Sequence, residues 1–196
     1  MSVLFSFILP MLHLKQIKGG NIVYPKAYID YLVEFHATRD YFECHEILEE
    51  YWKEDPPNKR KMYWVGFIQL AVALYHHRRQ NTAGAKRLMA NSIRILQAEK
   101  QAVEDLGLDH SRLLELMQTV DEQIEMGSPY KSIMLPIKDE KLEEACRIEC
   151  KKKKCTWGQH STLTDTFLID KHRLRDRTDV ILEREKEIER RKKSRG

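Results

Sequence analysis

The chain has 196 residues and a mass of 23.3 kDa, which is enough for one well-buried domain and an appendage. With 42% hydrophobic and 33% charged residues but only eight glycines and six prolines, the composition favours a helix-rich protein over a β-sandwich or barrel, which needs many turns. The net charge of +4 arises in the tail, because residues 171–196 contain eleven Lys or Arg against six Asp or Glu.

Residues 1–22 begin with an apolar run that resembles the core of a signal peptide. No Lys or Arg precedes this run, no small-residue cleavage site follows it, and it is too short to span a bilayer. We therefore expect no membrane association. Codons for the KGG segment can read as a bacterial ribosome-binding site, and GTG, an alternative start codon, encodes Val23. We expect residues 1–22 to be upstream sequence or a disordered N-terminus; the alternative is a genuine apolar N-terminal helix.

Successive helical patterns start at Tyr24. Pro25 is favoured in a first helical turn, and an apolar stripe at spacings of three and four follows it over residues 28–35. Asp40 can cap a second helix, with Glu43 completing a capping-box-like start. The two prolines of the DPP segment end this helix.

Three more helices are predicted before residue 128, at about residues 60–79, at about residues 83–106, and after a cap at Asp109. Short connections between five helices predict an all-α fold, an antiparallel helical bundle over residues 23–128. Residues 129–196 should form a basic, partly extended and partly helical C-terminal arm. Within the arm we expect an extended apolar segment, a short helix at about residues 140–152, and a charged terminal helix.

The stretch YFECHEILEEYW in the second helix carries the candidate site. Phe42, His45, Glu49 and Trp52 share one helix face, and His45 and Glu49 are one turn apart, so both can reach a common point. Such a pair supplies two ligands of a divalent metal site in carboxylate/His helical bundles. Glu46, about 100° round the helix, is a supporting residue, and Trp52 would shield the site from water.

Further ligands would come from the third helix, where His76 is the preferred choice and Gln69 lies on the same predicted face. Without metal, an imidazole–carboxylate pair satisfied by Gln69 and a tyrosine hydroxyl, such as that of Tyr75, would be a purely structural network. A pocket for an organic ligand is the third interpretation. Spacing alone leaves these three open.

Three segments, YFECHEILEEYW, GFIQLAVALYHH and NTAGAKRLM, together resemble the prokaryotic domain-of-unknown-function family number 309. The family motif, H-x-x-x-E-x-x-W/Y, is matched by His45, Glu49 and Trp52, and the resemblance covers about residues 24–96. It implies an all-helical fold and a motif suspected of binding metal, with no established activity.

Cys146, Cys150, Cys155 and His160 form a second candidate metal site, since three thiols and an imidazole are the ligands of structural zinc. Their spacing departs from the usual C-x2-C knuckles, and ordinary buried or half-exposed thiols are the alternative. Together with Cys44, the cysteines are too few for a disulfide framework, so we expect a reducing, cytoplasmic location.

The leading function is a non-catalytic helical binding or scaffold module whose interhelical His45/Glu49 site is able to hold a divalent metal. One alternative is a metal-dependent hydrolase, with Glu46 or Glu49 as general base on a metal-bound water. Another is an adaptor that binds nucleic acid, a protein partner or a second copy of the chain through the basic C-terminal helix. Phosphate-binding loops and dinucleotide fingerprints are absent from the sequence, so no nucleotide cofactor is expected.

Overall fold

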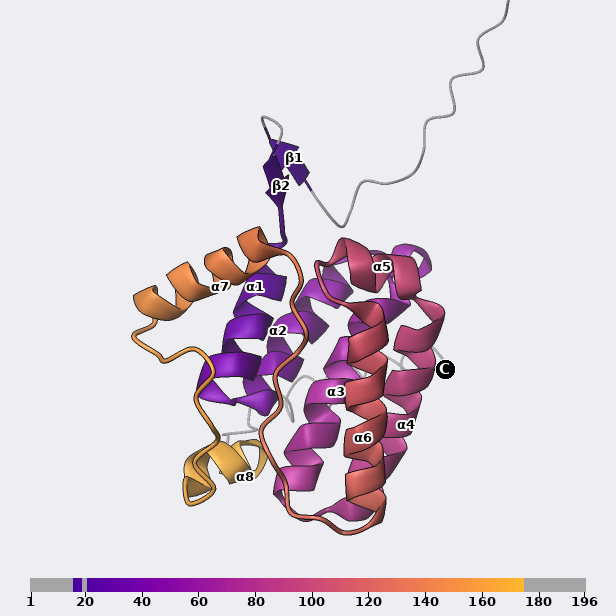
Figure 1. Ribbon diagram of the computed structural model, residues 1–196, viewed down its shortest axis with the longest axis vertical. Helices are drawn as coiled ribbons and strands as arrows, with labels where there is room; N and C mark the ends of the chain where they lie inside the picture. Colours follow the sequence, from indigo (N-terminus) through magenta and orange to yellow (C-terminus); the bar gives the residue numbers. More distant parts are fainter. Residues whose placement is uncertain (1–15, 19–20, 175–196) are drawn as a thin grey trace, which may run out of the picture.

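The computed structural model describes residues 16–18 and 21–174. An antiparallel hairpin of two short strands, β1 (Gln16–Lys18) and β2 (Asn21–Val23), precedes the first helix. The chain beyond the hairpin is built from helices, which confirms the all-α prediction (Figure 1). Most of the segment 1–22 and the tail 175–196, which carries most of the predicted basic helix, lie outside the described residues.

Eight α-helices are present in the described residues. Their bounds are α1 Lys26–Val33, α2 Tyr41–Glu54, α3 Met62–Arg78, α4 Thr82–Ala98, α5 Lys100–Asp105, α6 His110–Glu125, α7 Glu140–Lys152 and α8 Thr166–Leu174. A π-helix, Glu34–Thr38, extends α1, and a short 3-10 turn, Pro57–Lys59, follows α2. The bounds of α7 agree with the predicted short helix.

Side-chain caps determine where several helices begin. Asp40 accepts the backbone N–H of Glu43 at 3.0 Å, and Asp109 accepts that of Arg112 at 3.0 Å. Both caps agree with the sequence prediction. Asn81 starts α4 and Asp139 starts α7 in the same way, because an N-cap oxygen satisfies amides that have no partner within the helix.

α3 lies at the centre of the bundle, between α2 and α4, and α6 packs against α4 (Figure 1). Trp64 and Phe67 of α3 are buried. Leu70, Leu74 and, on the side of α3 opposite Trp64, Ala73 are also fully buried. Neighbours on several sides explain why α3 is apolar nearly all round.

The predicted fourth helix, residues 83–106, is two helices in the structure. α4 ends at Ala98, Glu99 leaves the helical region with φ −106° and ψ 36°, and α5 begins at Lys100. The break redirects the chain so that Val103 and Leu106 are both fully buried. Helical spacing alone did not reveal this change of direction.

The C-terminal arm packs into the same hydrophobic core as the bundle. Its buried residues are Tyr130, Leu135, Leu142, Cys146 and Cys150. α7 packs along α1, and residues 129–139 run in an extended path across the bundle between α6 and α7 (Figure 1). Arg39 ends the π-helix with φ +62° and is buried. Its guanidinium attaches the arm to the bundle by donating hydrogen bonds to the carbonyl oxygens of Ile133 at 2.6 Å and Gln159 at 2.7 Å.

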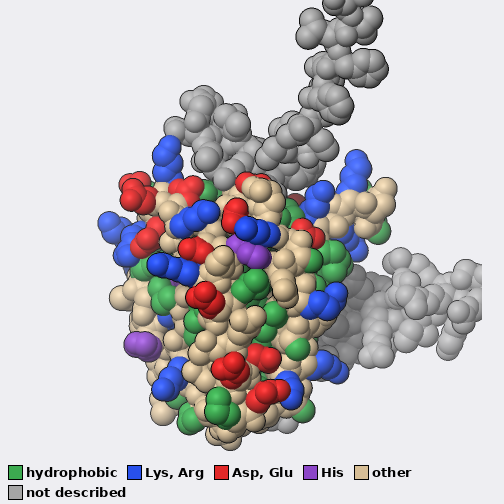
Figure 2. Space-filling view, turned by 45° about the vertical axis from the view of Figure 1, so that its right-hand side comes forward, with side chains coloured by type: hydrophobic (Ala, Val, Ile, Leu, Met, Phe, Trp, Pro, Cys, Tyr) green, Lys and Arg blue, Asp and Glu red, His purple; other side chains and the backbone are tan. Residues whose placement is uncertain are grey.

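The surface carries charges of both signs. Figure 2 shows a face on which acidic and basic side chains are interspersed, with hydrophobic side chains scattered between them. Among the described residues, no helix combines the length and apolar character that crossing a membrane requires.

Candidate metal site

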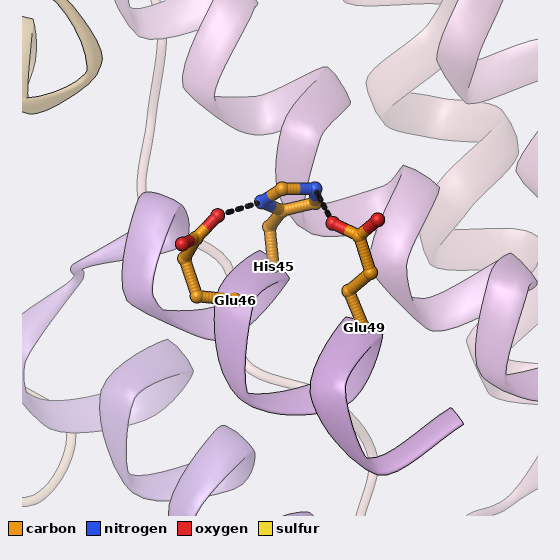
Figure 3. A group of neighbouring side chains, drawn as sticks. All are labelled: His45, Glu46 and Glu49. Atoms are coloured by element: carbon orange, nitrogen blue, oxygen red, sulfur yellow. Dashed lines mark ion pairs between the residues drawn. The ribbon is translucent and has the colours of Figure 1, made fainter. Parts of the chain in front are cut away.

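α2 places three candidate ligands at the surface of the bundle (Figure 3). His45 Nε2 lies 2.8 Å from Glu49 Oε2, and His45 Nδ1 lies 3.1 Å from Glu46 Oε1. The three side chains are 27–33% exposed. Within the described chain they are the group of His, Cys, Asp or Glu whose ligand atoms all lie within 4.8 Å.

Glu46 is closer to the site than helix geometry alone suggested. Its carboxylate reaches the Nδ1 edge of the His45 ring, so the imidazole is held between two carboxylates, as Figure 3 shows. A neutral imidazole has one N–H and one lone pair. One nitrogen would then direct its lone pair at a carboxylate oxygen, unless a proton or a cation lies between them.

The charge around Glu49 favours its ionised form. Partial burial acts to raise the pKa of Glu49, but the hydrogen bond from Lys53 at 2.6 Å and the charge of His45 outweigh it. The pKa of Glu49 therefore lies below its usual value, and the carboxylate keeps its charge at neutral pH. An ionised carboxylate beside an imidazole nitrogen is a suitable donor pair for a divalent cation.

The two ring nitrogens of one imidazole point in different directions, so a single ion could use one of them. His45 Nε2 with Glu49 forms one donor pair, and Glu46 then fixes the Nδ1–H tautomer. This arrangement of carboxylate, histidine and metal is frequent in metal sites, where the outer carboxylate orients the ring. The residues present thus fit a divalent ion, with Glu46 as the orienting group.

A cavity of about 320 Å³ opens beside His45, between α2 and α3. Its lining residues are Tyr41, Phe42, His45, Val72, Tyr75, His76 and Arg79. α8 borders the cavity, since Lys171 lies 6.0 Å above the Phe42 ring and Asp170 pairs with Arg79 at 3.1 Å. Apolar walls with a few polar groups are typical of small-molecule sites.

His76 lines the same cavity as His45, but its hydrogen bond restricts its role. The cap oxygen of Asn81 accepts from Gly84 N–H, which leaves the Asn81 amide NH2 to donate to His76 Nδ1 at 2.9 Å. The proton of a neutral His76 is then on Nε2. In this arrangement His76 is an N–H donor, and acting as the third metal ligand would require its tautomer to change.

The remaining supporting residues lie in different places. Tyr75 lines the cavity, whereas Gln69 turns to α4 and accepts from Asn91 at 2.6 Å. The Arg60 guanidinium lies 4.5 Å above the Trp52 ring, and His45 stays partly exposed, so the shielding of the site by Trp52 stays a prediction.

The cysteines do not gather around His160. Cys150 and Cys155 face each other with their sulfurs 2.8 Å apart, and Cys146 is buried against α1. His160 is exposed beside a different cavity, next to Tyr130 and Ser161. The structure therefore forms a pair of thiols in place of the predicted four-ligand cluster, because the loop after α7 carries His160 away.

Sequence reasoning missed the part that Arg79 and α8 play at this cavity. Arg79 follows the end of α3, three residues after His76, which is one helical turn and a signal for a shared face. The approach of Asp170 and Lys171 depends on the path of the arm, and no local pattern reveals it.

The fold and the cluster define a class of protein: an all-helical bundle with a partly exposed His/Glu motif on its second helix. The chain belongs to the DUF309 family, described as a domain of unknown function, whose model matches residues 28–88. The chain is also 88% identical over 173 residues to the uncharacterized protein YpuF of Bacillus subtilis (strain 168), an alignment that covers 88% of this chain and 99% of YpuF. No solved structure gives a significant match.

Proposed function

We propose that this protein is a cytoplasmic helical binding module that holds a divalent metal ion between His45 and Glu49. The separation of 2.8 Å between His45 Nε2 and Glu49 Oε2 carries the proposal. Adjacent ligands of an ion bonded at about 2.1 Å lie roughly 3 Å apart when they are at right angles. The two side chains therefore need little movement to bind an ion, and four free thiols support a reducing compartment.

The ion would have few protein ligands, which suits a binding role. α2 supplies two donors, and the third residue of the cluster, Glu46, orients His45. Open coordination positions would be available to a ligand in the adjoining cavity, where Arg79 and the His76 N–H add positive character. A ligand with an acidic group and an apolar body would match both the charged end and the aromatic walls.

A metal-dependent hydrolase is the second candidate, and the cavity beside His45 favours it. A divalent ion supplies Lewis acidity to such a reaction. Glu46 and Glu49 are both close enough to His45 to exchange protons at that end of the cavity. This candidate differs from the binding module in requiring turnover of a substrate by the metal-loaded protein.

The proposal predicts that metal content follows the α2 cluster. Untagged protein is dialysed against a buffered mixture of Zn²⁺, Mn²⁺ and Fe²⁺ without oxygen, and bound metal is measured by elemental mass spectrometry. We expect about one ion per chain in the wild type and loss of that ion in His45→Ala/Glu49→Ala. Glu50→Gln is the matched control, because Glu50 is exposed on the same helix outside the cluster, and it should retain the ion.

The cysteine variant Cys150→Ser/Cys155→Ser separates the two candidate sites. Retention of metal in this variant, together with its loss from the α2 variant, supports the proposal. Loss of metal from the cysteine variant alone would show that the ion binds in the arm and not at the α2 cluster. Absence of metal from every sample would make the cluster a polar network of His45 with the two carboxylates.

A further inference from the structure

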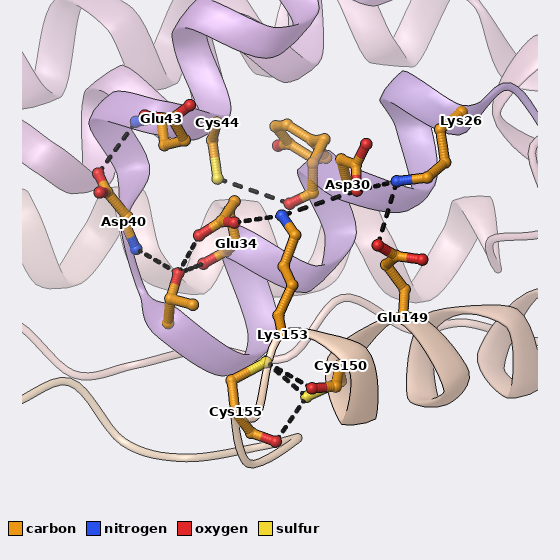
Figure 4. Close-up of polar contacts among 12 residues, drawn as sticks. Lys26, Asp30, Glu34, Asp40, Glu43, Cys44, Glu149, Cys150, Lys153 and Cys155 are labelled. Carbon is orange, nitrogen blue, oxygen red and sulfur yellow. Dashed lines mark hydrogen bonds and ion pairs between the residues drawn. The ribbon is translucent and has the colours of Figure 1, made fainter.

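Two cysteines of the arm form a close pair outside the α2 site. Cys150 lies in the last turn of α7, and Cys155 follows it after four lysines. Their sulfurs are 2.8 Å apart, closer than two sulfurs normally pack without a bond but longer than the roughly 2.05 Å of a disulfide. Figure 4 shows both thiols pointing at each other at the end of α7.

The backbone around the pair holds this arrangement in place. The N–H of Cys155 donates to the carbonyl of Cys150 at 3.0 Å, and each sulfur also lies near the carbonyl of the other residue. Lys154, at φ +56°, makes the tight turn that brings Cys155 back. Lys153 reaches from this turn to Glu34 of the π-helix at 2.7 Å, as Figure 4 shows.

The two thiols differ in their access to solvent. Cys150 is 2% exposed, while Cys155 is partly exposed. Burial, with the hydrogen bond and charge of Cys155 adding to it, raises the pKa of Cys150 to about 12. Cys150 thus keeps its proton at neutral pH and can donate it to the sulfur of Cys155. Cys155 is the sulfur that a small oxidant can reach.

We propose that Cys150 and Cys155 are a redox modification site at which a hydroperoxide converts the two thiols into a disulfide. Cys155 Sγ gives up its proton and attacks one peroxide oxygen, so that an S–O bond forms, the O–O bond breaks and the released proton is available to the leaving hydroxide. With hydrogen peroxide this step yields a sulfenic acid on Cys155 and, after protonation of the leaving hydroxide, water.

Cys150 completes the reaction. Its sulfur attacks Cys155 Sγ, the S–S bond forms, the S–O bond breaks, and the departing hydroxide takes the Cys150 proton to leave as water. Overall two thiols lose two electrons and two protons, and one hydrogen peroxide becomes two water molecules. The sulfurs need to approach by less than 1 Å, from 2.8 Å to about 2.05 Å, so little of the fold has to move.

The position of the pair links its oxidation to the attachment of the arm. Two residues beyond Cys155, Trp157 stacks on His36 at 4.7 Å with 6° between the rings, and Gly158 N–H donates to the His36 carbonyl at 3.0 Å. A disulfide would join the end of α7 covalently to this segment. Hydrogen exchange of the amides at 155–159 should therefore be slower in the oxidised protein than in the reduced protein.

The test is mass spectrometry of the full chain after mild hydrogen peroxide, with free thiols alkylated under denaturing conditions. We expect a monomer lighter by about 2 Da before alkylation, loss of two of its four thiols, and a linked pair of tryptic peptides that contain Cys150 and Cys155. Cys146→Ser, which removes a thiol one turn earlier in α7, should form the same linked pair.

Two further variants test the order of the steps. Cys155→Ser should abolish the loss of about 2 Da and leave Cys150 unoxidised, and because Cys155 is partly exposed this variant should fold. Cys150→Ser should leave a sulfenic acid on Cys155 that dimedone labels. Retention of all four thiols in the wild type, persistence of the mass loss in Cys155→Ser, or a product linked between two chains would each overturn the proposal.

Discussion

His36 shows how the fold controls the protonation of a single residue. It is fully buried in the π-helix, and neither ring nitrogen has a hydrogen-bond partner among the described residues. Burial, and then the charge of Arg39, lowers the pKa of His36 to about 3 from an ordinary value of 6.5. The neutral ring can therefore stack on Trp157 without an ion-pair partner.

The linkage between His36 and folding predicts a loss of stability in mild acid. Because its pKa is lower in the folded state, the unfolded state takes up the proton first, so stability is complete above about pH 6.5 and falls as the pH decreases toward 3. Between pH 7 and pH 5 the loss from this residue is about 2 kcal/mol. His36→Phe keeps an aromatic ring but cannot titrate.

Urea unfolding at both pH values checks this prediction. The wild type should lose about 2 kcal/mol more than His36→Phe over that interval. The other titratable groups are the same in the two proteins, so the difference isolates His36. Equal losses in both proteins would show that His36 accepts its proton in the folded state.

At the level of the elements, the pairing of α3 with α4 depends on small residues. Ser92 of α4 donates its hydroxyl to the carbonyl of Gly66 in α3 at 2.7 Å. A Cβ on Gly66 would lie 2.7 Å from Leu96 Cδ2 and 3.2 Å from Ile95 Cγ2. The glycine thus permits a close approach that alanine, although a better helix former, would obstruct.

We expect Gly66→Ala to destabilise the protein by about 1–3 kcal/mol, because Leu96 is fully buried and has little room to move. Chemical unfolding measures this change. Leu96→Ala provides the control: in the double variant the new methyl group has space, so the combined loss should be smaller than the sum of the single losses. If the losses in unfolding free energy are additive, the effect of Gly66→Ala does not come from the contact with Leu96.

At the scale of the whole molecule, the arm and the bundle share one core. Tyr130 contributes its hydroxyl to a 2.7 Å contact with that of Tyr41, and Leu142, Cys146 and Cys150 of α7 pack on α1. Tyr24 donates to Asp139, the cap of α7, at 2.5 Å. These contacts attach the arm to α1, to α2 and to the region just before α1.

Truncation after residue 128 should therefore abolish cooperative unfolding, since it uncovers His36 and Tyr41, which are fully buried in the complete chain and contact Trp157 and Tyr130 of the arm. Thermal unfolding followed by circular dichroism, with dye binding to exposed apolar surface, tests this. A chain that ends at Leu174 keeps every core residue named here and is the control. A sharp, unchanged transition in the shorter fragment would show that residues 23–128 fold alone.

Local patterns in the sequence were sufficient to predict the all-α class, the helix caps at Asp40 and Asp109 and the bounds of α7. They also predicted that His45 and Glu49 lie on one face of a helix. These features depend on residues within a few positions of each other, where spacing and capping chemistry act directly. The resemblance to the DUF309 family rested on the same residues, and the family match confirmed it.

Tertiary structure decided the features that join distant parts of the chain. The approach of α8 to the cavity, the stacking of Trp157 on His36 and the contact of Arg39 with the arm all depend on how elements pack. Side-chain direction, burial and hydrogen-bond partners are set by neighbours far away in sequence. The sequence by itself therefore determined the helices and the candidate ligands, and the fold determined which of those side chains meet.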